Sequence, residues 1–445
     1  MVSEWGALTV DQIKAKDERS IAIGPFGSRM KADTYVTSGV PVIRGNNISD
    51  TRTLAGDFVY VSEQTADELK SCNVFAGDLV FPHRGAIGQV GIVPNSEVSR
   101  FILSTSLMKL TCNRELVDPL FVFYFFRSSF GRQALLQHAS TVGTPGIGQP
   151  LTSLRSIRLP IPPRSEQRAI AHILGTLDDK IELNRRRNQN LEAMARALFQ
   201  DWFVDFGPVR AKIEGRKPYL PANLWQLFPD RIDADDKPRG WKRSTIGEEV
   251  SVCGGSTPST KEPTFWDSGI HNWATPKDLS AIAFPVLLGT ERKITDQGLE
   301  KISSGLLPAG TVLLSSRAPI GYLAIAEVPT AINQGFIAMK CDGALPNIFV
   351  LLWCRENMGA IVGNANGSTF LEISKSNFRP LPIVVPEDKL LSVFRQQVGS
   401  IYNRIVESER ESRALSDLRN TLLPKLISGE LRIMDAEKFL ERAGV

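Results

Sequence analysis

The chain has 445 residues, of which 42% are hydrophobic, and its 52 basic and 48 acidic side chains give a net charge of +4 at pH 7. This length exceeds one ordinary core and predicts two domains plus connecting elements. No apolar run reaches the roughly 20 residues of a membrane helix, and the first residues lack the features of a secretion signal. We therefore expect a cytoplasmic protein without membrane association, and the charge neither proves nor excludes a DNA ligand.

Catalytic and metal-binding motifs are missing from the sequence. The five cysteines show no Cys-x-x-Cys spacing, and four histidines are too few to favour a zinc cluster, so we interpret the thiols as buried or idle. There is no phosphate-binding loop, no dinucleotide-binding glycine pattern and no adenine-methyltransferase segment. The sequence predicts no catalytic residue, no metal site and no cofactor bound by this chain.

The chain repeats itself. The segment from Gly77 to Gly88 recurs from Gly310 to Gly321 with both glycines, the arginine and the isoleucine preserved. The flanks agree in order: Trp5 to Ile13 pairs with Trp241 to Glu249, Gly39 to Ile43 with Gly269 to Trp273, and Leu159-Pro-Ile-Pro with Leu381-Pro-Ile-Val. Residues 1–160 and 241–385 are therefore predicted to be two related domains.

Each half shows short β-rich runs bounded by Gly, Pro, Asn and Asp, which predict strands. Examples are Asp78 to Phe81, Val90 to Val93, Thr311 to Leu314 and Tyr322 to Ile325. Helical patches at Pro119 to Gln137 and Asn347 to Val362 interrupt these runs. The predicted fold class is α+β with an internal pseudo-two-fold repeat.

A heptad pattern follows each half, in residues 161–206 and 386–432. The first seam runs from Ile170 to Trp202 and the second from Phe394 to Leu422, and each carries polar residues midway: Asn184 and Asn188, Ser408 and Ser412. Polar seam residues fix register at a cost in stability. We favour antiparallel pairing of the two helices within one chain, with a parallel homodimer as the alternative. Residues 207–240 are expected to form a linker with a buried patch at Leu224 to Phe228, and 433–445 a tail.

Three segments carry a resemblance to a known family. Leu198-Phe-Gln-Asp-Trp-Phe-Val-Asp-Phe-Gly-Pro-Val-Arg-Ala-Lys212, Leu422-Leu-Pro-Lys-Leu-Ile-Ser-Gly-Glu-Leu-Arg432 and Pro160-Ile-Pro-Pro-Arg-Ser-Glu-Gln-Arg-Ala-Ile170 are similar to signatures of the specificity (S) subunit of type I restriction-modification enzymes. The second copy, Pro386-Glu-Asp-Lys-Leu-Leu391, departs from the family by lacking the Glu-Gln pair. The resemblance covers essentially the whole chain.

The resemblance implies that each half is a target recognition domain that reads one part of a split, asymmetric site in double-stranded DNA. It implies that the helices set the spacing and dock two methylation subunits, which modify adenines with S-adenosylmethionine. Two restriction subunits, which require ATP and magnesium, would cleave unmodified DNA.

Each seam of about 33 residues spans roughly 50 Å, compared with about 34 Å for one turn of DNA.

Base reading requires Arg, Lys, Asn or Gln on loops or helix ends. The loops of the two halves supply candidates for DNA binding, namely Ser28, Arg29, Lys31, Arg44, Asn46, Asn47, His83, Arg84, Thr260, Lys261, Lys277, Ser316, Arg317, Asn364, Asn366 and Ser368. Arg84 and Arg317 are the repeated pair. A feature shared by domains that read different sequences does not specify a base, so these arginines either contact phosphates or form a structural hydrogen bond.

Other side chains have competing interpretations. The aromatic cluster Phe199, Trp202, Phe203 and Phe206 is either core at a helix end or, as we favour, an anchor for the methylation subunits. We interpret the run Arg185 to Arg187 as a solvated helix face, with a phosphate clamp as the alternative. A coiled-coil scaffold without a DNA role is the main alternative function, and a stand-alone endonuclease would need a metal site that the sequence does not show.

Overall fold

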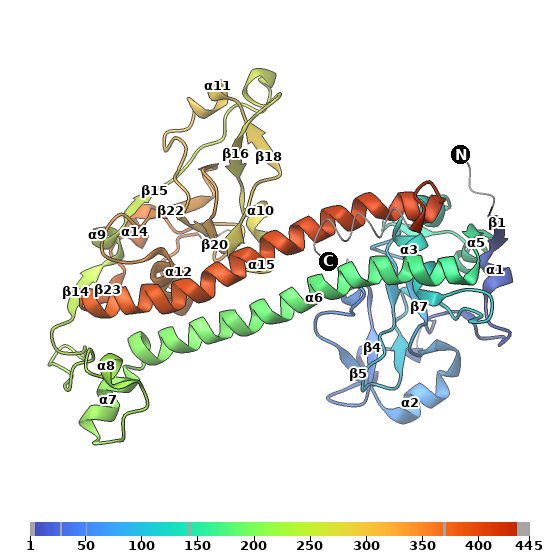
Figure 1. The fold of residues 1–445 in the computed structure, drawn as a ribbon, viewed down its shortest axis with the longest axis horizontal. Helices are drawn as coiled ribbons and strands as arrows, with labels where there is room; N and C mark the ends of the chain where they lie inside the picture. Colours follow the sequence, from blue (N-terminus) through green and yellow to red (C-terminus); the bar gives the residue numbers. More distant parts are fainter. Residues whose placement is uncertain (1–4, 27–28, 50, 141–143, 368–370, 434–445) are drawn as a thin grey trace. The chain divides into compact units, whose positions relative to one another are not determined.

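The computed structural model describes residues 5–26, 29–49, 51–140, 144–367 and 371–433 (Figure 1). The chain forms two compact units: unit 1 consists of Met1–Leu183 and Ser412–Val445, and unit 2 of Asn184–Glu411. Each unit combines sheets with helices. This composition confirms the predicted α+β class.

Unit 1 contains two larger sheets. One has the order β2-β10-β7-β8, with strands Ile21–Ile23, Leu107–Leu110, Leu79–Pro82 and Gly91–Ile92. The other has the order β3-β5-β4-β9-β6, with strands Tyr35–Val36, Val59–Val61, Val40–Ile43, Phe101–Leu103 and Asn73–Val74. Short pairs join β1 to β13 (Gly6–Thr9, Arg158–Ile161) and β11 to β12 (Ala139–Ser140, Gly146–Ile147). The shorter helices include α1 (Val10–Ile13), α2 (Glu63–Glu68), α3 (Pro119–Arg127), α4 (Ser129–Leu136) and α5 (Pro150–Ser156).

Unit 2 is built on the same plan. Its larger sheet has the order β15-β22-β19-β20-β17, with strands Ser251–Cys253, Phe336–Lys340, Val312–Ser315, Leu323–Ala326 and Val286–Leu287. A second sheet, β18-β16-β21, uses Arg292–Ile294, His271–Ala274 and Thr330–Ile332, and β14 (Lys242–Thr245) pairs with β23 (Pro382–Val385). The helices include α9 (Ile246–Glu249), α10 (Pro276–Ser280), α11 (Asp296–Leu299), α12 (Asn347–Glu356), α13 (Met358–Gly363) and α14 (Lys375–Phe378). The predicted strands and helical patches are confirmed within one or two residues.

The sequence of α3 in unit 1 determines where this helix begins, where it ends and how it packs. The carboxylate of Asp118 accepts a hydrogen bond from the backbone N–H of Leu120 and starts α3, and Ser128 ends it while capping α4. Every residue from Phe121 to Phe126 is buried. A helix that is apolar on all sides must be covered on all sides, and here the sheet and the long helices share one core with it.

Strand registers refine the repeat. Thr9 pairs with Arg158 in unit 1, and Thr245 pairs with Pro382 in unit 2. Both threonines also form capping boxes at the next helix, which confirms the match of Trp5 to Ile13 with Trp241 to Glu249. In these registers Leu159 lies opposite Leu8, and Ile383 lies opposite Ser244, the residue that corresponds to Leu8. Leu159 therefore corresponds to Ile383, and its sequence match with Leu381 was wrong by two residues. Proline-rich strand ends look alike in sequence, and only the pairing partner fixes their register.

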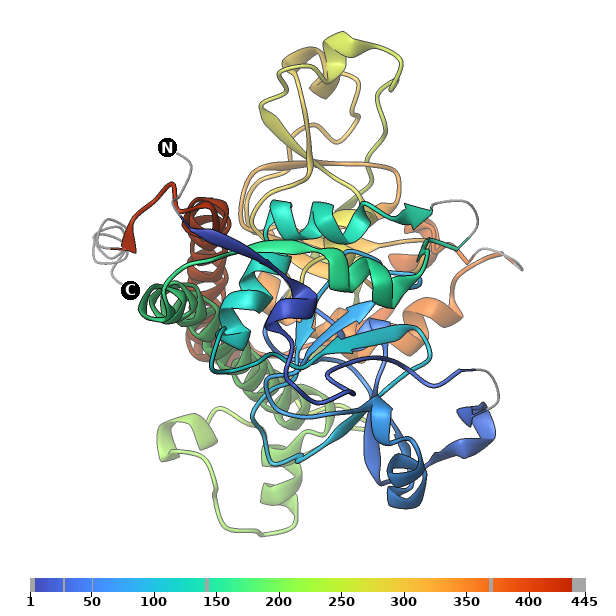
Figure 2. The ribbon, with the colours of Figure 1, turned by 90° about the vertical axis from the view of Figure 1, so that its right-hand side faces the viewer.

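The long helices are α6 (Arg164–Phe199) and α15 (Asp388–Ser428), and each contributes one part to unit 1 and the other to unit 2. In unit 1 the start of α6 lies beside the end of α15 (Figures 1 and 2). The two segments share a core through Leu174, Leu177, Leu422 and Leu426. In unit 2 the end of α6 shares a core with the start of α15. The pairing is antiparallel within each unit, which confirms the favoured prediction of intrachain pairing.

The start of α6 explains the Glu-Gln signature. Gln167 is buried, its Oε1 accepts from the backbone N–H of Asp118, and its amide donates to the carbonyls of Leu116 and Pro162. At the corresponding seam position of α15, unit 2 buries Leu391. The departure of the second copy therefore replaces a polar anchor by apolar packing.

Residues 207–240 contribute to the core of unit 2. After a π-helical turn (Gln200–Val204) come α7 (Gly207–Ile213) and α8 (Ala222–Trp225), and Leu224 and Phe228 are buried as expected. Phe199, Trp202 and Phe203 lie in the same core with at most 8% of each residue exposed. The prediction that these three anchor a partner is wrong, because neighbouring rings such as Phe349 and Phe394 already cover them. Phe206 is half-buried against Trp241.

Candidate nucleic-acid interface

A tight turn between β9 and β10 holds together the candidate loops of unit 1. Within residues 104–107, the carbonyl of Leu107 accepts from the N–H of Gly24, the N–H of Ser104 donates to the carbonyl of Ile43, and the carbonyl of Ser106 accepts from the N–H of His83. The segments that precede Arg29, Arg44 and Arg84 are therefore all hydrogen-bonded to the same turn. We call residues 104–107 the hub of unit 1.

Unit 2 has the same arrangement between β21 and β22. The N–H of Ser256 donates to the carbonyl of Ile332, the N–H of Asn333 to that of Ala274, and the N–H of Ser316 to that of Gly335. Residues 332–335 form the hub of unit 2. Sequence segments that are distant from one another thus meet at matching places in both units, although neither turn belongs to a recognised motif.

The repeated arginines lie directly beside the hubs. Ile147 donates its N–H to the carbonyl of His83, as Ile373 does to that of Ser316. Arg84 then forms a β-bridge with Gly146, and Arg317 forms one with Glu372. The backbone around the two arginines is therefore duplicated together with the sequence.

Three predicted DNA-contacting side chains are buried. Asn47 donates to the carbonyls of Ala55 and Asp57, and His83 Nε2 lies 3.1 Å from the carbonyl oxygen of Thr105. Burial also lowers the pKa of the His83 imidazole. Ser316 is 3% exposed. For these three residues the prediction of a direct DNA contact is corrected, because they stabilise the loops from inside.

The other candidates lie at or near the surface. Arg44 is half-buried and donates to the carbonyl of Asp57, and Lys277 forms a 2.7 Å ion pair with Glu291. Asn366 exchanges two backbone hydrogen bonds with Glu372, beside Arg317. Exposed candidates are Arg29, Lys31, Asn46, Arg84, Thr260, Lys261, Lys277, Asn364 and Asn366. Ser28 and Ser368 lie outside the described residues.

The hubs supply two surface residues that the sequence analysis missed. Thr105 and Gln334 are exposed, and each lies in the middle of its turn. Gln334 Oε1 accepts a 2.6 Å hydrogen bond from the hydroxyl of Thr257. Short polar turns between two apolar strands, Ser104-Thr-Ser106 and Asn333-Gln-Gly335, were the available signal. We add Thr105 and Gln334 to the candidate base-reading residues, because a glutamine amide pairs well with adenine.

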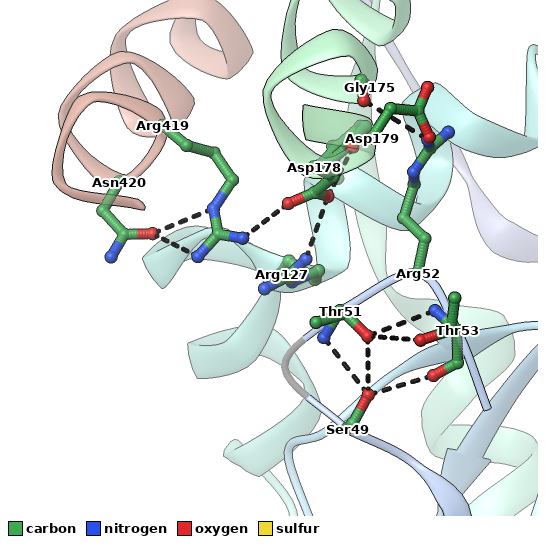
Figure 3. A network of polar contacts seen from close by, with 11 residues as sticks. Ser49, Thr51, Arg52, Thr53, Arg127, Gly175, Asp178, Asp179, Arg419 and Asn420 are labelled. Carbon is green, nitrogen blue, oxygen red and sulfur yellow. Dashed lines mark hydrogen bonds and ion pairs between the residues drawn. The ribbon is translucent and has the colours of Figure 1, made fainter. Parts of the chain in front are cut away.

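A buried carboxylate joins α3 of unit 1 to both long helices. Figure 3 shows Asp178 of α6 between Arg127 and Arg419. Its Oδ1 lies 2.5 Å from Arg419 Nη1, and its Oδ2 accepts from the hydroxyl of Tyr124 at 2.7 Å and lies 3.3 Å from Arg127 Nη1. Next to it, Arg52 contacts Asp179 and the carbonyl of Gly175. The loop between Arg44 and Asp57 is thereby held to α6.

The polar residues of the seam make specific contacts in unit 2. Asn184 donates to Glu411 at 2.7 Å and Asn188 donates to Glu409 at 2.8 Å, and both asparagines are buried. Burial raises the pKa of the Glu409 carboxyl. These contacts fix the antiparallel register predicted from the polar interruptions, and the partners of the asparagines are two glutamates that the sequence analysis did not single out.

The described residues offer no evident metal-binding or thiol chemistry. Within them, no three His, Cys, Asp or Glu side chains are grouped to hold a metal ion. Burial raises the pKa of every cysteine thiol, for Cys341 to about 12, so the thiols stay protonated and poorly nucleophilic. None of the helices in the described part of the chain combines the length and apolar character needed to cross a bilayer.

The chain is similar to known proteins. The chain matches the type I restriction modification DNA specificity domain twice, over residues 27–193 and 238–398. It is 27% identical over 403 residues to the type I restriction enzyme HindI specificity subunit of Haemophilus influenzae, which covers 80% of this chain and 86% of the relative. It is 33% identical over 198 residues to the MjaIX specificity subunit of Methanocaldococcus jannaschii, covering 43% of this chain and 44% of that one.

A solved structure supports the fold. The crystal structure of a type I restriction-modification system S subunit from M. genitalium aligns with a TM-score of 0.55 at 14% identity, covering 96% of both chains. Two copies of the family domain together span most of the chain. The protein therefore belongs to the type I restriction modification DNA specificity domain family.

Proposed function

We propose that this chain is the sequence-reading specificity subunit of a type I restriction-modification complex, and that each unit reads one half of a bipartite, asymmetric DNA site. The observation that carries this proposal is the pair of hubs, 104–107 and 332–335, which hold matching loops together in the two units. The loops differ in sequence while their supports agree. This combination suits two readers of different half-sites on one scaffold.

The chain itself is proposed to be non-catalytic. Its candidate residues are cations, amides and hydroxyls on loops, which bind phosphates and base edges. Adenine methylation with S-adenosylmethionine, and cleavage that requires ATP and magnesium, would belong to two methylation and two restriction subunits. The relatives named above are specificity subunits, which supports this division of labour.

The long helices are proposed to set the distance between the half-sites and to dock the methylation subunits. α6 and α15 have 36 and 41 residues. At about 1.5 Å per residue each extends over more than 50 Å, compared with about 34 Å for a turn of DNA. Exposed apolar side chains on α6, Leu183 at 59% and Met194 at 54%, are candidates for partner contact.

In vitro selection tests the proposal. The full chain, assembled with its methylation subunits, is incubated with random-sequence DNA duplexes, and the bound fraction is sequenced. We expect enrichment of two short motifs separated by a fixed unspecified gap. Enrichment of a single continuous motif would contradict the two-reader arrangement, and no enrichment would favour a scaffold without a DNA role.

A further inference from the structure

The two repeated arginines have the same backbone setting and different electrostatic settings. Arg84 bridges to Gly146, and Arg317 bridges to Glu372. Arg317 Nη1 lies 3.6 Å from Glu372 Oε2, with 38% and 49% of the two side chains exposed. Arg84 is exposed, and among the described residues its guanidinium has no hydrogen-bond or ion-pair partner. A side-chain hydrogen bond common to both arginines, one of the two alternatives from the sequence, is therefore absent from the described residues.

In unit 1 the position that corresponds to Glu372 is Gly146, where an added Cβ atom would meet no close neighbour. A Cβ atom added to Gly146 would lie 3.9 Å from Arg84 Cγ and 3.6 Å from the carbonyl oxygen of His83. Both distances are ordinary van der Waals contacts. The difference between the units is thus a difference of residue type, with a glutamate in one and a glycine in the other, and not a consequence of backbone crowding.

The electrostatic consequence follows from how proteins bind DNA. An arginine that neutralises a phosphate releases a counterion, which adds about 0.9 to the slope of log affinity against log salt concentration. A carboxylate next to that arginine cancels its charge, so the pair neutralises no phosphate. The exposed ion pair itself contributes only about 0–1 kcal/mol to stability, so this glutamate has a small role in holding the fold.

We propose that Arg84 contacts a DNA phosphate in unit 1, and that Glu372 cancels the corresponding contact of Arg317 in unit 2. This inference rests on the proposed function and extends it. The two units therefore differ in how strongly they attract the phosphates of their half-sites. Unit 2 consequently depends more on base contacts, for which Gln334 lies within the hub that adjoins Arg317.

Salt-dependent binding tests the inference. The affinity of the full chain with its methylation subunits is measured between 50 and 200 mM salt on a duplex that carries the selected motif. We expect Arg84→Ala to flatten the slope by about 0.9, which is about 3.5-fold less loss of affinity over this range. Arg317→Ala should leave the slope unchanged, whereas Glu372→Gln should steepen it by about 0.9.

Reciprocal variants provide the controls. Gly146→Glu should flatten the slope as Arg84→Ala does, with Gly146→Ala as the uncharged control. The effect of Glu372→Gln should disappear in the Arg317→Ala background if it acts through the arginine. An unchanged slope in Arg84→Ala overturns the phosphate contact, and an effect of Glu372→Gln that survives Arg317→Ala overturns the cancellation.

A scrambled duplex separates the two hypotheses. If the wild-type complex prefers the motif over the scrambled duplex while the variants show no slope changes, the further inference fails and the proposed function stands. If the complex shows no preference for the motif, the proposed function fails whatever the slopes are.

Discussion

Asp178 and Arg419 form a buried ion pair in which Asp178 Oδ1 and Arg419 Nη1 are 2.5 Å apart. They are 241 residues apart in sequence, and only 3% and 9% of the two side chains are exposed. The same carboxylate accepts a hydrogen bond from the hydroxyl of Tyr124. One side chain of α6 thus joins α3 to the end of α15.

The first prediction concerns this pair. Asp178→Ala should destabilise unit 1 by about 3–5 kcal/mol, because it leaves the buried Arg419 without its carboxylate. Hydrogen exchange should show faster opening of α3, the start of α6 and the end of α15, with unit 2 unchanged. Asp179→Ala is the matched control, since Asp179 forms an exposed pair with Arg52 that contributes at most about 1 kcal/mol. Equal effects of the two substitutions would contradict the account.

The second prediction concerns the pH dependence of the seam. Because burial raises the pKa of Glu409, the folded chain prefers the protonated carboxyl. Its contribution to stability is complete below the unfolded pKa of about 4.3 and is lost as pH rises through the folded pKa. Glu409→Gln should therefore stabilise the chain at pH 7, and the gain should disappear near pH 4.

Unfolding experiments at both pH values check this second prediction. The uncharged amide can also donate to Asn188 Oδ1, which has no partner among the described residues. Glu407→Gln, at an exposed neighbouring position, is the control and should change little at either pH. A gain from Glu409→Gln that is equal at both pH values would argue against the burial effect.

The third prediction tests the corrected role of the aromatic cluster. Phe199 is 1% exposed and contacts the rings of Phe349 and Phe394. Phe199→Ala should destabilise unit 2 by about 3–5 kcal/mol. Val204→Ala, on the same segment but 40% exposed, should change stability by less than about 0.5 kcal/mol. Weaker binding of methylation subunits by Phe199→Ala at unchanged stability would restore the anchor interpretation.

The fourth prediction concerns helix length. Inserting one heptad of seven residues into α6 and another into α15 keeps the seam in phase. At about 1.5 Å per residue the insertion adds about 10.5 Å, which corresponds to roughly three base pairs at about 3.4 Å each. The unspecified gap of the recognised motif should lengthen with both half-sites unchanged. A gap of constant length would show that the helices do not set the spacing.

The heptad helices were the most predictable part of the fold. Their period reports directly which residues face a partner, and the seam residues Leu174, Leu191 and Val398 are buried as expected. The hydrogen-bond partners of the polar seam residues were harder to predict from the sequence. Asn188 bonds with Glu409, which is one residue outside the heptad seam, because the rotation of each helix is fixed by tertiary packing and not by the period alone.

The candidate site was only partly predictable, because sequence shows which residues are polar and not what surrounds them. Arg84 and Asn47 look alike as loop residues, yet Arg84 is exposed and Asn47 is fully buried. The hubs also depend on hydrogen bonds between distant segments, such as Gly24 with Leu107. For the same reason the dense aromatic segment was read as a surface anchor, although distant residues such as Phe394 cover it.

The most direct test of the central claim is single-molecule sequencing of adenine methylation in two hosts that differ only in this chain. Both express the neighbouring methylation subunit. If the chain reads the sequence, a split asymmetric motif is methylated only in the host that contains it. Methylation at the same motif in the host without this chain would show that another component selects the site.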